Sequence, residues 1–304
     1  MKVLHLLALV GFATLSWGQA SPTLRPDPPH VCSDCDEWNR PQQGFRIYGN
    51  TYYVGTAGLS ALLITSDKGH ILLDGALTQS AALIDANIRQ LGFQTTDIRL
   101  IVNSHAHFDH AGAIAALQRV SGATVAASAQ GARALQQGGA TPDDPQYGFG
   151  RAPNAIPPVA KVQVVADGEV LRVGGLALKA HLTPGHTPGS TTWAWQSCEG
   201  PRCVNVVYAD SLNAVSAPKF RFTGDGTAPN IVDSFRNSIN KVASLPCDII
   251  VSVHPSFTEI DAKLKRRAQQ PDGPNPFIDA QGQGCRAYAA GAMKRLEARL
   301  ATER

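Results

Sequence analysis

The segment Ser104-His105-Ala106-His107-Phe108-Asp109-His110 is the most informative part of this chain. It directly follows the apolar run 98–102, which is typical of a buried strand. At an extended strand end, residues two apart point the same way, so His105 and His107 can converge on one ion. Asp109 and His110 follow at the point where the chain should turn into the next helix. The pattern His-x-His-x-Asp-His therefore predicts half of each of two neighbouring metal sites.

The other histidines bear on whether this segment is a chance cluster. A solvated loop rich in histidine is the alternative, but three of the nine histidines in the chain fall within 105–110. Two others, His186 and His254, also follow apolar runs, at 176–182 and 249–253. Gly and Pro on both sides of His186 predict a tight loop. Because α/β proteins assemble their sites where strands end at one sheet edge, we expect these side chains to converge.

Two carboxylates also stand at expected strand ends. Asp74 follows an apolar run, and we expect it to hold a ligand histidine, because such partners fix the tautomer of the ring. Asp210 ends another strand-like run. Of the remaining histidines, His181 is expected to line or flank the site, and His70 is expected in a hairpin turn.

Length and charge narrow the class of protein. With 304 residues, 43% of them hydrophobic, the chain can bury a sizeable core. The net charge of +3 is spread along the sequence, with no basic run longer than Lys265-Arg266-Arg267. This argues against a nucleic-acid partner. No segment beyond the N-terminal one is apolar enough to span a bilayer, so we expect no membrane partner either.

Residues 1–20 have the three parts of a secretory signal peptide. A short positive start precedes an apolar run from Val3 to Trp17, and Ala20 suits the small-residue rule before cleavage. The apolar run is too short for a comfortable membrane span. We therefore expect export, with residues 21–304 forming a single domain.

Six cysteines remain after export, and an even number in an oxidising compartment predicts up to three disulfides. The first expected pair flanks a turn-rich stretch between two strand-like runs, and the second would tie a strand to the C-terminal helix. The two remaining cysteines form the third pair. These pairs are Cys198–Cys203, Cys247–Cys285 and Cys32–Cys35. For the third pair a Cys-x-x-Cys metal or redox site stays open, although it lacks a second cysteine pair near a suitable histidine.

The remaining pattern is that of one alternating α and β unit. Strands are expected at 45–48, 51–54, 61–65, 71–73, 98–102, 124–127, 162–165, 170–173, 176–182, 191–196, 204–209 and 248–253. Helices are expected at 81–91, 113–120, 129–135, 231–245 and 286–299. Residues 136–158 form a loop rich in Gly, Pro, Asp and Asn, and loops of that length are often functional.

Taken together, these residues resemble the metallo-β-lactamase superfamily, and more closely its zinc β-lactamases of subclass B3. The resemblance covers nearly all of residues 21–304. Its carriers are Asp74, the segment His105–His110, the loop around His186, Tyr208-Ala209-Asp210-Ser211-Leu212, and Cys247-Asp248 followed by His254-Pro255. The other zinc β-lactamase subclasses have a cysteine ligand near the position of Ser211 and lack histidine at position 110. Here Ser211 cannot act as a thiolate, and His110 can fill the vacated coordination place.

The resemblance implies an αβ/βα sandwich, in which two mixed β-sheets are flanked by helices and two zinc ions lie at one edge. The first zinc would be bound by His105, His107 and His186. The second would be bound by Asp109, His110 and His254. Three protein ligands per ion leave coordination places open, as in catalytic zinc sites.

The implied reaction is hydrolysis of the β-lactam amide bond of penicillins, cephalosporins and carbapenems, which confers antibiotic resistance. A hydroxide bridging the two ions would be the nucleophile. Asp109 would orient it and help to move its proton, and Ser211 would hold the substrate carboxylate together with Asn213, which stands where many relatives have Ser or Thr. The resemblance further implies a monomer in the periplasm of a Gram-negative bacterium, with a small-molecule β-lactam as its partner.

Asp210 and the substrate class leave alternatives. In thioesterase-like relatives such as glyoxalase II, an Asp in this region bridges the two metals, whereas here we expect Asp210 to support the site. Another exported zinc hydrolase, acting on a thioester or a lactone, and a non-catalytic zinc-binding protein are the alternative functions. Serine β-lactamase chemistry is not expected, because the Ser-x-x-Lys matches at Ser216 and Ser238 lack their companion motifs.

Overall fold

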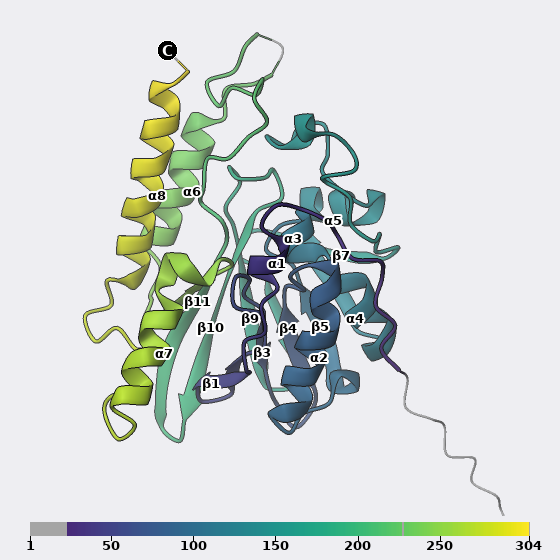
Figure 1. Ribbon diagram of the computed structural model, residues 1–304. Helices are drawn as coiled ribbons and strands as arrows, with labels where there is room; N and C mark the ends of the chain where they lie inside the picture. Colours follow the sequence, from purple (N-terminus) through teal and green to yellow (C-terminus); the bar gives the residue numbers. More distant parts are fainter. Residues whose placement is uncertain (1–22, 227, 304) are drawn as a thin grey trace, which may run out of the picture.

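Two β-sheets run through the centre of the molecule (Figure 1). The computed structural model describes residues 23–226 and 228–303, so the expected signal peptide at 1–20 lies outside the described residues. The first sheet contains, in spatial order, β1 (Phe45–Tyr48), β2 (Thr51–Tyr53), β3 (Leu62–Ile64), β4 (His70–Leu73), β5 (Ile98–Val102), β6 (Thr124–Ser128) and β7 (Val162–Val165). The second contains β12 (Ile249–Ser252), β11 (Arg202–Ala209), β10 (Thr191–Glu199), β9 (Leu176–Leu182) and β8 (Val170–Val173).

Helices and short 3-10 turns connect these strands. The α-helices are α1 (Cys35–Trp38), α2 (Ala81–Gln90), α3 (Phe108–Ala111), α4 (Ile114–Ser121), α5 (Ala129–Gln137), α6 (Val232–Ala243), α7 (Ile260–Gln269) and α8 (Gly284–Ala301). The 3-10 turns are η1 (Thr78–Ser80), η2 (Thr95–Asp97), η3 (Tyr147–Phe149) and η4 (Pro255–Thr258). Gly122 ends α4 with a φ of 69°, a left-handed conformation that glycine adopts without steric cost.

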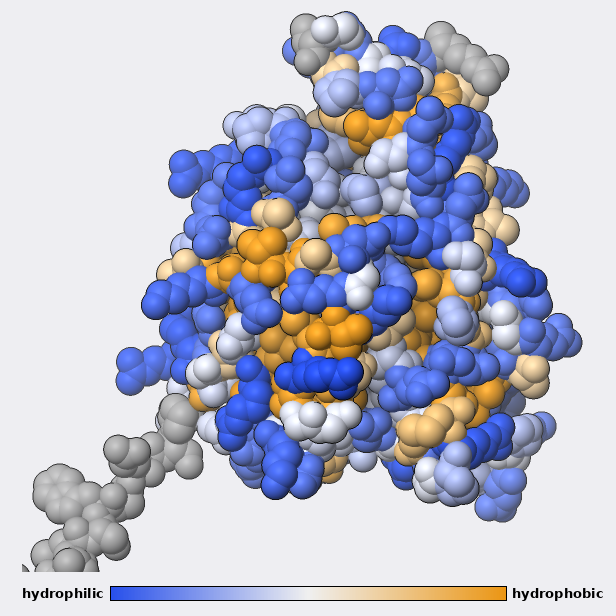
Figure 2. All heavy atoms as spheres, turned by 180° about the vertical axis from the view of Figure 1, so that it is seen from behind, coloured by the Kyte–Doolittle hydropathy of each residue, from blue (hydrophilic) through white to orange (hydrophobic). Residues whose placement is uncertain are grey.

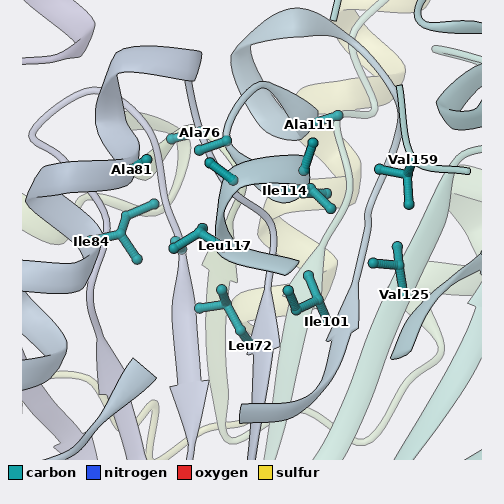
Figure 3. Packing of buried hydrophobic residues seen from close by; sticks show 14 of the residues in the cluster. Leu72, Ala76, Ala81, Ile84, Ile101, Ala111, Ile114, Leu117, Val125 and Val159 are labelled. Carbon is teal, nitrogen blue, oxygen red and sulfur yellow. The ribbon is translucent and has the colours of Figure 1, made fainter. Parts of the chain in front are cut away.

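Helices pack against the outer face of each sheet, which gives four layers (Figure 1). Between the first sheet and its helices, Leu72 and Ile101 pack with Ile114 of α4 (Figure 3). A second core, between the two sheets, contains the fully buried Trp193. The third contains Phe235 and packs α6 and α8 on the second sheet. The arrangement confirms the expected αβ/βα sandwich of two mixed sheets.

The strand directions bring the functional segments to one edge. β4, β5, β6 and β7 are parallel neighbours, and in the second sheet β11 and β12 are also parallel. The side chains of β4 are all buried, which explains the uninterrupted apolar run that follows His70. Because parallel strands end at the same edge of their sheet, the segments that follow β4, β5, β11 and β12 can meet there.

All three expected disulfides are present. Cys198 and Cys203 are opposite each other in the β10–β11 hairpin. Cys247, just before β12, is bonded to Cys285 in the first turn of α8. The third bond joins Cys32 to Cys35, so the Cys-x-x-Cys pair is a disulfide and the metal-site alternative for it is wrong.

One local expectation is also wrong, and one helix was missed. The helix α7 was not predicted, because within it only Ile260 is buried and its charged residues leave no clear apolar stripe. His70 was expected in a hairpin turn but is the buried first residue of β4, paired with Ile98 of β5.

Part of the apolar surface stays open to solvent. From behind, hydrophobic residues form a broad patch across the middle of the molecule, surrounded by hydrophilic ones (Figure 2). The exposed large apolar side chains include Val164 of β7 and Val170 of β8, both on edge strands. Among the described residues no helix is both long enough and apolar enough to cross a bilayer.

Candidate metal centre and active site

The carboxyl ends of four strands supply the side chains of the predicted site, both the expected metal ligands and Asp210 and Ser211. The segment after β5 carries His105, His107, Asp109 and His110, β9 leads to His186, β11 leads to Asp210 and Ser211, and β12 leads to His254. All are buried except His254, whose side chain is 18% exposed. The chain enters α3 directly after His107, and this places Asp109 and His110 on the first helical turn.

The first group of ligand atoms comes from His105, His107 and His186, which lie within 4.8 Å of one another. Each ring has one nitrogen held by an oxygen from another part of the chain. The contacts are His105 Nδ1 to Asp210 Oδ1 at 2.6 Å, His186 Nδ1 to the Asn213 carbonyl oxygen at 2.7 Å, and His107 Nε2 to Asp144 Oδ2 at 3.2 Å. The other ring nitrogen of each histidine is thereby left to bind an ion.

A second group lies beside the first. Ligand atoms of His105, Asp109 and His110 also lie within 4.8 Å of one another. Oδ2 of Asp109 is 3.2 Å from His110 Nε2 and 3.3 Å from Nε2 of His254. The structure therefore brings His254 to the same carboxylate as His110, from the opposite sheet.

Several buried polar atoms of the site have no hydrogen-bond partner in the structure. They are Nε2 of His105, both ring nitrogens of His110, and Oδ2 of Asp210. Leaving such groups unsatisfied in a protein interior costs roughly 1–3 kcal/mol each. A cation bound here would take Nε2 of His105 and one ring nitrogen of His110, and imidazole is a ligand that zinc prefers. The residues present therefore fit a metal centre.

The electrostatics of the site also suit metal binding. Burial and the neighbouring His110 and His186 hold the pKa of His105 well below its usual value. Burial, with His107 nearby, lowers the pKa of His186 to about 3. Burial alone would raise the pKa of Asp109, but His110 and His254 hold it well below its usual range. Neutral imidazoles and an ionised carboxylate are the forms that bind metal.

His107 differs from its two neighbours. Burial disfavours its charged form, but the Asp144 carboxylate outweighs this and raises the pKa of His107 above its usual value. The pKa of Asp144 is lowered in turn, because His107 offsets the effect of burial on the carboxylate. The two side chains are electrostatic partners.

Asp74 does not make the contact that was expected of it. Its carboxylate accepts hydrogen bonds from the backbone N–H of Ser104 at 2.7 Å, from Ser104 Oγ at 2.6 Å, and from the Tyr208 hydroxyl at 2.9 Å. It therefore fixes the end of β5, one residue before His105, and none of its hydrogen bonds is with a histidine. The buried partner that holds His105 directly is Asp210.

A cavity of about 300 Å³ opens above the site. Its walls include the predicted substrate residues Ser211 and Asn213. Trp38, Gln146 and Phe257 also line it, and the sequence did not identify them. Only the length of the 136–158 loop pointed to the region of Gln146 and Asp144. His181, which was expected to line or flank this site, lines a separate cavity on the second sheet.

Comparisons with known proteins agree with this geometry. The sequence profile of the metallo-beta-lactamase superfamily matches residues 55–198. A solved subclass B3 metallo-β-lactamase from a soil metagenome library is 48% identical, with 88% of this chain and 98% of that chain covered and a TM-score of 0.83. The solved Rm3 metallo-β-lactamase is also 48% identical, with 90% and 99% covered and a TM-score of 0.85.

A curated relative has an activity that differs from that of the two β-lactamases. The hydroxyacylglutathione hydrolase of Anaeromyxobacter dehalogenans (strain 2CP-C) is 29% identical over 232 residues, which are 75% of this chain and 70% of that protein. The similarity to this thioester hydrolase is thus weaker and shorter than the similarity to the two β-lactamases.

Proposed function

This chain belongs to the metallo-β-lactamase superfamily, and from that membership we propose that it hydrolyses the β-lactam amide bond with two zinc ions as cofactors. The observation that carries the proposal is the 48% identity to a subclass B3 enzyme, 98% of which the alignment covers. The histidine and aspartate side chains gathered where β5, β9 and β12 end support it. Penicillins, cephalosporins and carbapenems are the proposed substrates.

We assign the ligands in two sets. His105, His107 and His186 would hold the first ion, and Asp109, His110 and His254 the second. Two observations support this division: each histidine of the first set has one ring nitrogen held by an oxygen, and neither ring nitrogen of His110 makes a hydrogen bond. With three protein ligands each, both ions would keep a place for water or substrate.

When bound, zinc would supply a coordinated water of lowered pKa, about 7, and would polarise the lactam carbonyl. Asp109 is ionised and lies between His110 and His254, so its carboxylate can orient the attacking water and accept a proton. Ser211 and Asn213 line the cavity and can donate hydrogen bonds to the substrate carboxylate. Trp38 and Phe257 give the cavity apolar walls that exclude water around the reacting bond.

A thioester hydrolase is the second candidate, because hydroxyacylglutathione hydrolase is among the relatives. In that case Asp210 would bridge the two ions. Its Oδ1 is already occupied by His105 Nδ1, and neither group of candidate ligand atoms within 4.8 Å includes it. These contacts favour the lactamase assignment.

Hydrolysis of a chromogenic cephalosporin, with and without a chelator, tests the proposal against a glutathione thioester assayed in parallel. We expect the protein to hydrolyse the cephalosporin but not the thioester, to lose this activity on chelation and to regain it with zinc. Clavulanate-type compounds should not inhibit it, because no serine is acylated. Turnover of the thioester alone would favour the second candidate. At most one ion per chain in the zinc-loaded active protein would contradict the dinuclear assignment.

We also propose that residues 1–20 direct export to the periplasm and that the mature chain begins at residue 21. The three disulfides support this, since such bonds persist in oxidising compartments. N-terminal sequencing of the protein recovered from a periplasmic extract tests it. A mature protein that still begins at Met1 would contradict the proposal.

A further inference from the structure

Asp144 is a buried carboxylate that lies between a proposed metal ligand and the cavity wall. It belongs to the long loop between α5 and β7, and only 5% of its surface is exposed. Its two carboxylate oxygens lie 3.2 and 3.3 Å from Nε2 of His107. Oδ1 also accepts a hydrogen bond of 2.8 Å from the backbone N–H of Gln146, a residue that lines the cavity. The Asp144 side chain thus contacts both a proposed metal ligand and a residue of the cavity wall.

The contact with His107 fixes which ring nitrogen can bind an ion. With Nε2–H donating to a carboxylate, Nδ1 is unprotonated and is the atom left for the metal. A carboxylate partner also makes the imidazole a better ligand by holding its ring orientation and raising its basicity. Asp144 therefore has the geometry of a positioning residue for the first ion.

The contact with Gln146 matters because the loop has little apolar packing of its own here. The turn η3 contains no buried residue, and the side chains of Tyr147 and Phe149 are 49% and 44% exposed. Polar contacts hold this part of the loop instead. The Asn154 side chain donates to the carbonyl oxygens of Gln146 at 3.0 Å and Gly150 at 2.9 Å.

We propose that Asp144 couples the first metal site to the substrate-facing loop. The carboxylate that orients His107 toward the ion also holds Gln146 at the cavity wall, so zinc binding and the order of residues 138–158 depend on each other. Such coupling is reciprocal: if zinc stabilises the loop, a loosened loop weakens zinc binding by the same factor. The inference rests on the metal centre of the proposed function, but not on a β-lactam being the substrate.

The test uses three variants of the full-length mature protein. Asp144→Ala removes both contacts. Asp144→Asn keeps an oxygen for the Gln146 N–H but removes the charge beside His107. Asp143→Asn is the matched control, since Asp143 is the adjacent residue, is exposed, and pairs with Arg133 at 2.9 Å. For each protein, competition with a chromophoric chelator gives the two zinc-binding constants, and hydrogen–deuterium exchange of 138–158 is measured with and without zinc.

We expect Asp144→Ala to weaken one of the two zinc constants by about 10–100-fold, while Asp143→Asn leaves both unchanged. Zinc should slow exchange across 138–158 in the wild type and the control, and should fail to do so in Asp144→Ala. If Asp144→Ala does not fold, Asp144→Asn decides alone. It should lose about tenfold in one zinc constant and keep wild-type exchange in the zinc-free loop.

Two results would overturn the inference. One is wild-type zinc constants in both Asp144 variants, and the other is loop exchange in the wild type that does not respond to zinc. Neither measurement uses a β-lactam. A protein that shows the coupling but hydrolyses no cephalosporin would therefore contradict the proposed function and leave the role of Asp144 intact.

Discussion

Oδ1 of Asp210 lies 2.6 Å from Nδ1 of His105, and both side chains are completely buried. Asp210 follows β11 of the second sheet and His105 follows β5 of the first. The contact therefore joins the two sheets at the metal centre, so the way the sheets pack sets where His105 points. The backbone oxygen of Asp210 also accepts a 2.7 Å hydrogen bond from the hydroxyl of Tyr288 in α8, which holds the backbone of the aspartate in place.

The first prediction concerns this pair. Asp210→Ala leaves Nδ1 of His105 without its partner, and we expect a loss of about 1–3 kcal/mol in stability and about 10–100-fold in zinc affinity. Asp210→Asn can still offer an oxygen to Nδ1, so it should lose much less of both. Zinc competition and urea unfolding of the two variants measure this. Equal loss of zinc in both variants would instead indicate that Asp210 binds metal directly.

A second prediction concerns the disulfide between Cys247 and Cys285, which spans 38 residues of sequence and ties the start of β12 to α8. By the loop-entropy argument it contributes about 4 kcal/mol, against about 2 kcal/mol for Cys198–Cys203, which spans 5. We therefore expect the Cys247→Ala/Cys285→Ala protein to unfold at lower urea concentration than Cys198→Ala/Cys203→Ala. Equal stability losses would contradict this, as would free thiols at these positions in the exported protein.

Much of the site could be predicted because of where its residues stand in the sequence. His105, His186 and His254 each stand within a few residues of the end of an apolar strand, and parallel strands must end at a common edge. The disulfide Cys198–Cys203 was predictable for a similar reason, since its cysteines flank a hairpin turn. In these cases the local sequence carries the information.

The rest depends on contacts between distant segments. Asp144 reaches His107 across 37 residues, and no local pattern distinguishes it from Asp143 beside it. Trp38 lines the cavity because its ring lies 5.4 Å from that of His254, which is distant in the sequence. The helix α7 was missed because half of its residues are charged and its weak apolar stripe gives little periodic signal.

A third prediction concerns how the stability that the Glu303 carboxylate contributes depends on pH. The Glu303 carboxylate accepts hydrogen bonds from the backbone N–H groups of Phe222 and Thr223, each at 2.9 Å. Burial opposes ionisation, but these donors and the hydroxyl of Thr223 outweigh it and hold the pKa of Glu303 below its ordinary value of 4.5. The carboxylate therefore stabilises the fold above about pH 4.5, and this contribution is lost as pH falls through the lowered pKa.

Glu303→Gln should accordingly cost about 1–3 kcal/mol near neutral pH, because an uncharged amide accepts these hydrogen bonds less strongly. The difference in the free energy of unfolding between the wild type and the variant should shrink as the pH falls below the lowered pKa of Glu303, because the wild-type side chain is then also neutral. Urea unfolding of both zinc-free proteins across this pH range measures it. A difference that stays constant with pH would contradict the role given to the charge.

The last prediction tests whether His110 binds the second ion and whether Ser211 contacts substrate only. If His110 binds the second ion, His110→Ala should weaken that ion's binding by more than the roughly 10–100-fold typical of losing a residue that only supports a ligand. The three-histidine site should keep its own ion, because His110 is not among its ligands. Ser211→Ala should keep both ions, since Ser211 lines the cavity and is proposed to touch substrate only.

The kinetics of Ser211→Ala complete the argument. A lost contact that binds substrate and transition state equally raises KM and leaves kcat nearly unchanged, so the KM for β-lactams should rise more than kcat falls. Metal analysis and steady-state assays of the two variants check both expectations. Loss of metal from Ser211→Ala, with both ions retained in His110→Ala, would place the second ion beside Asp210 and Ser211 and would contradict the subclass B3 ligand set.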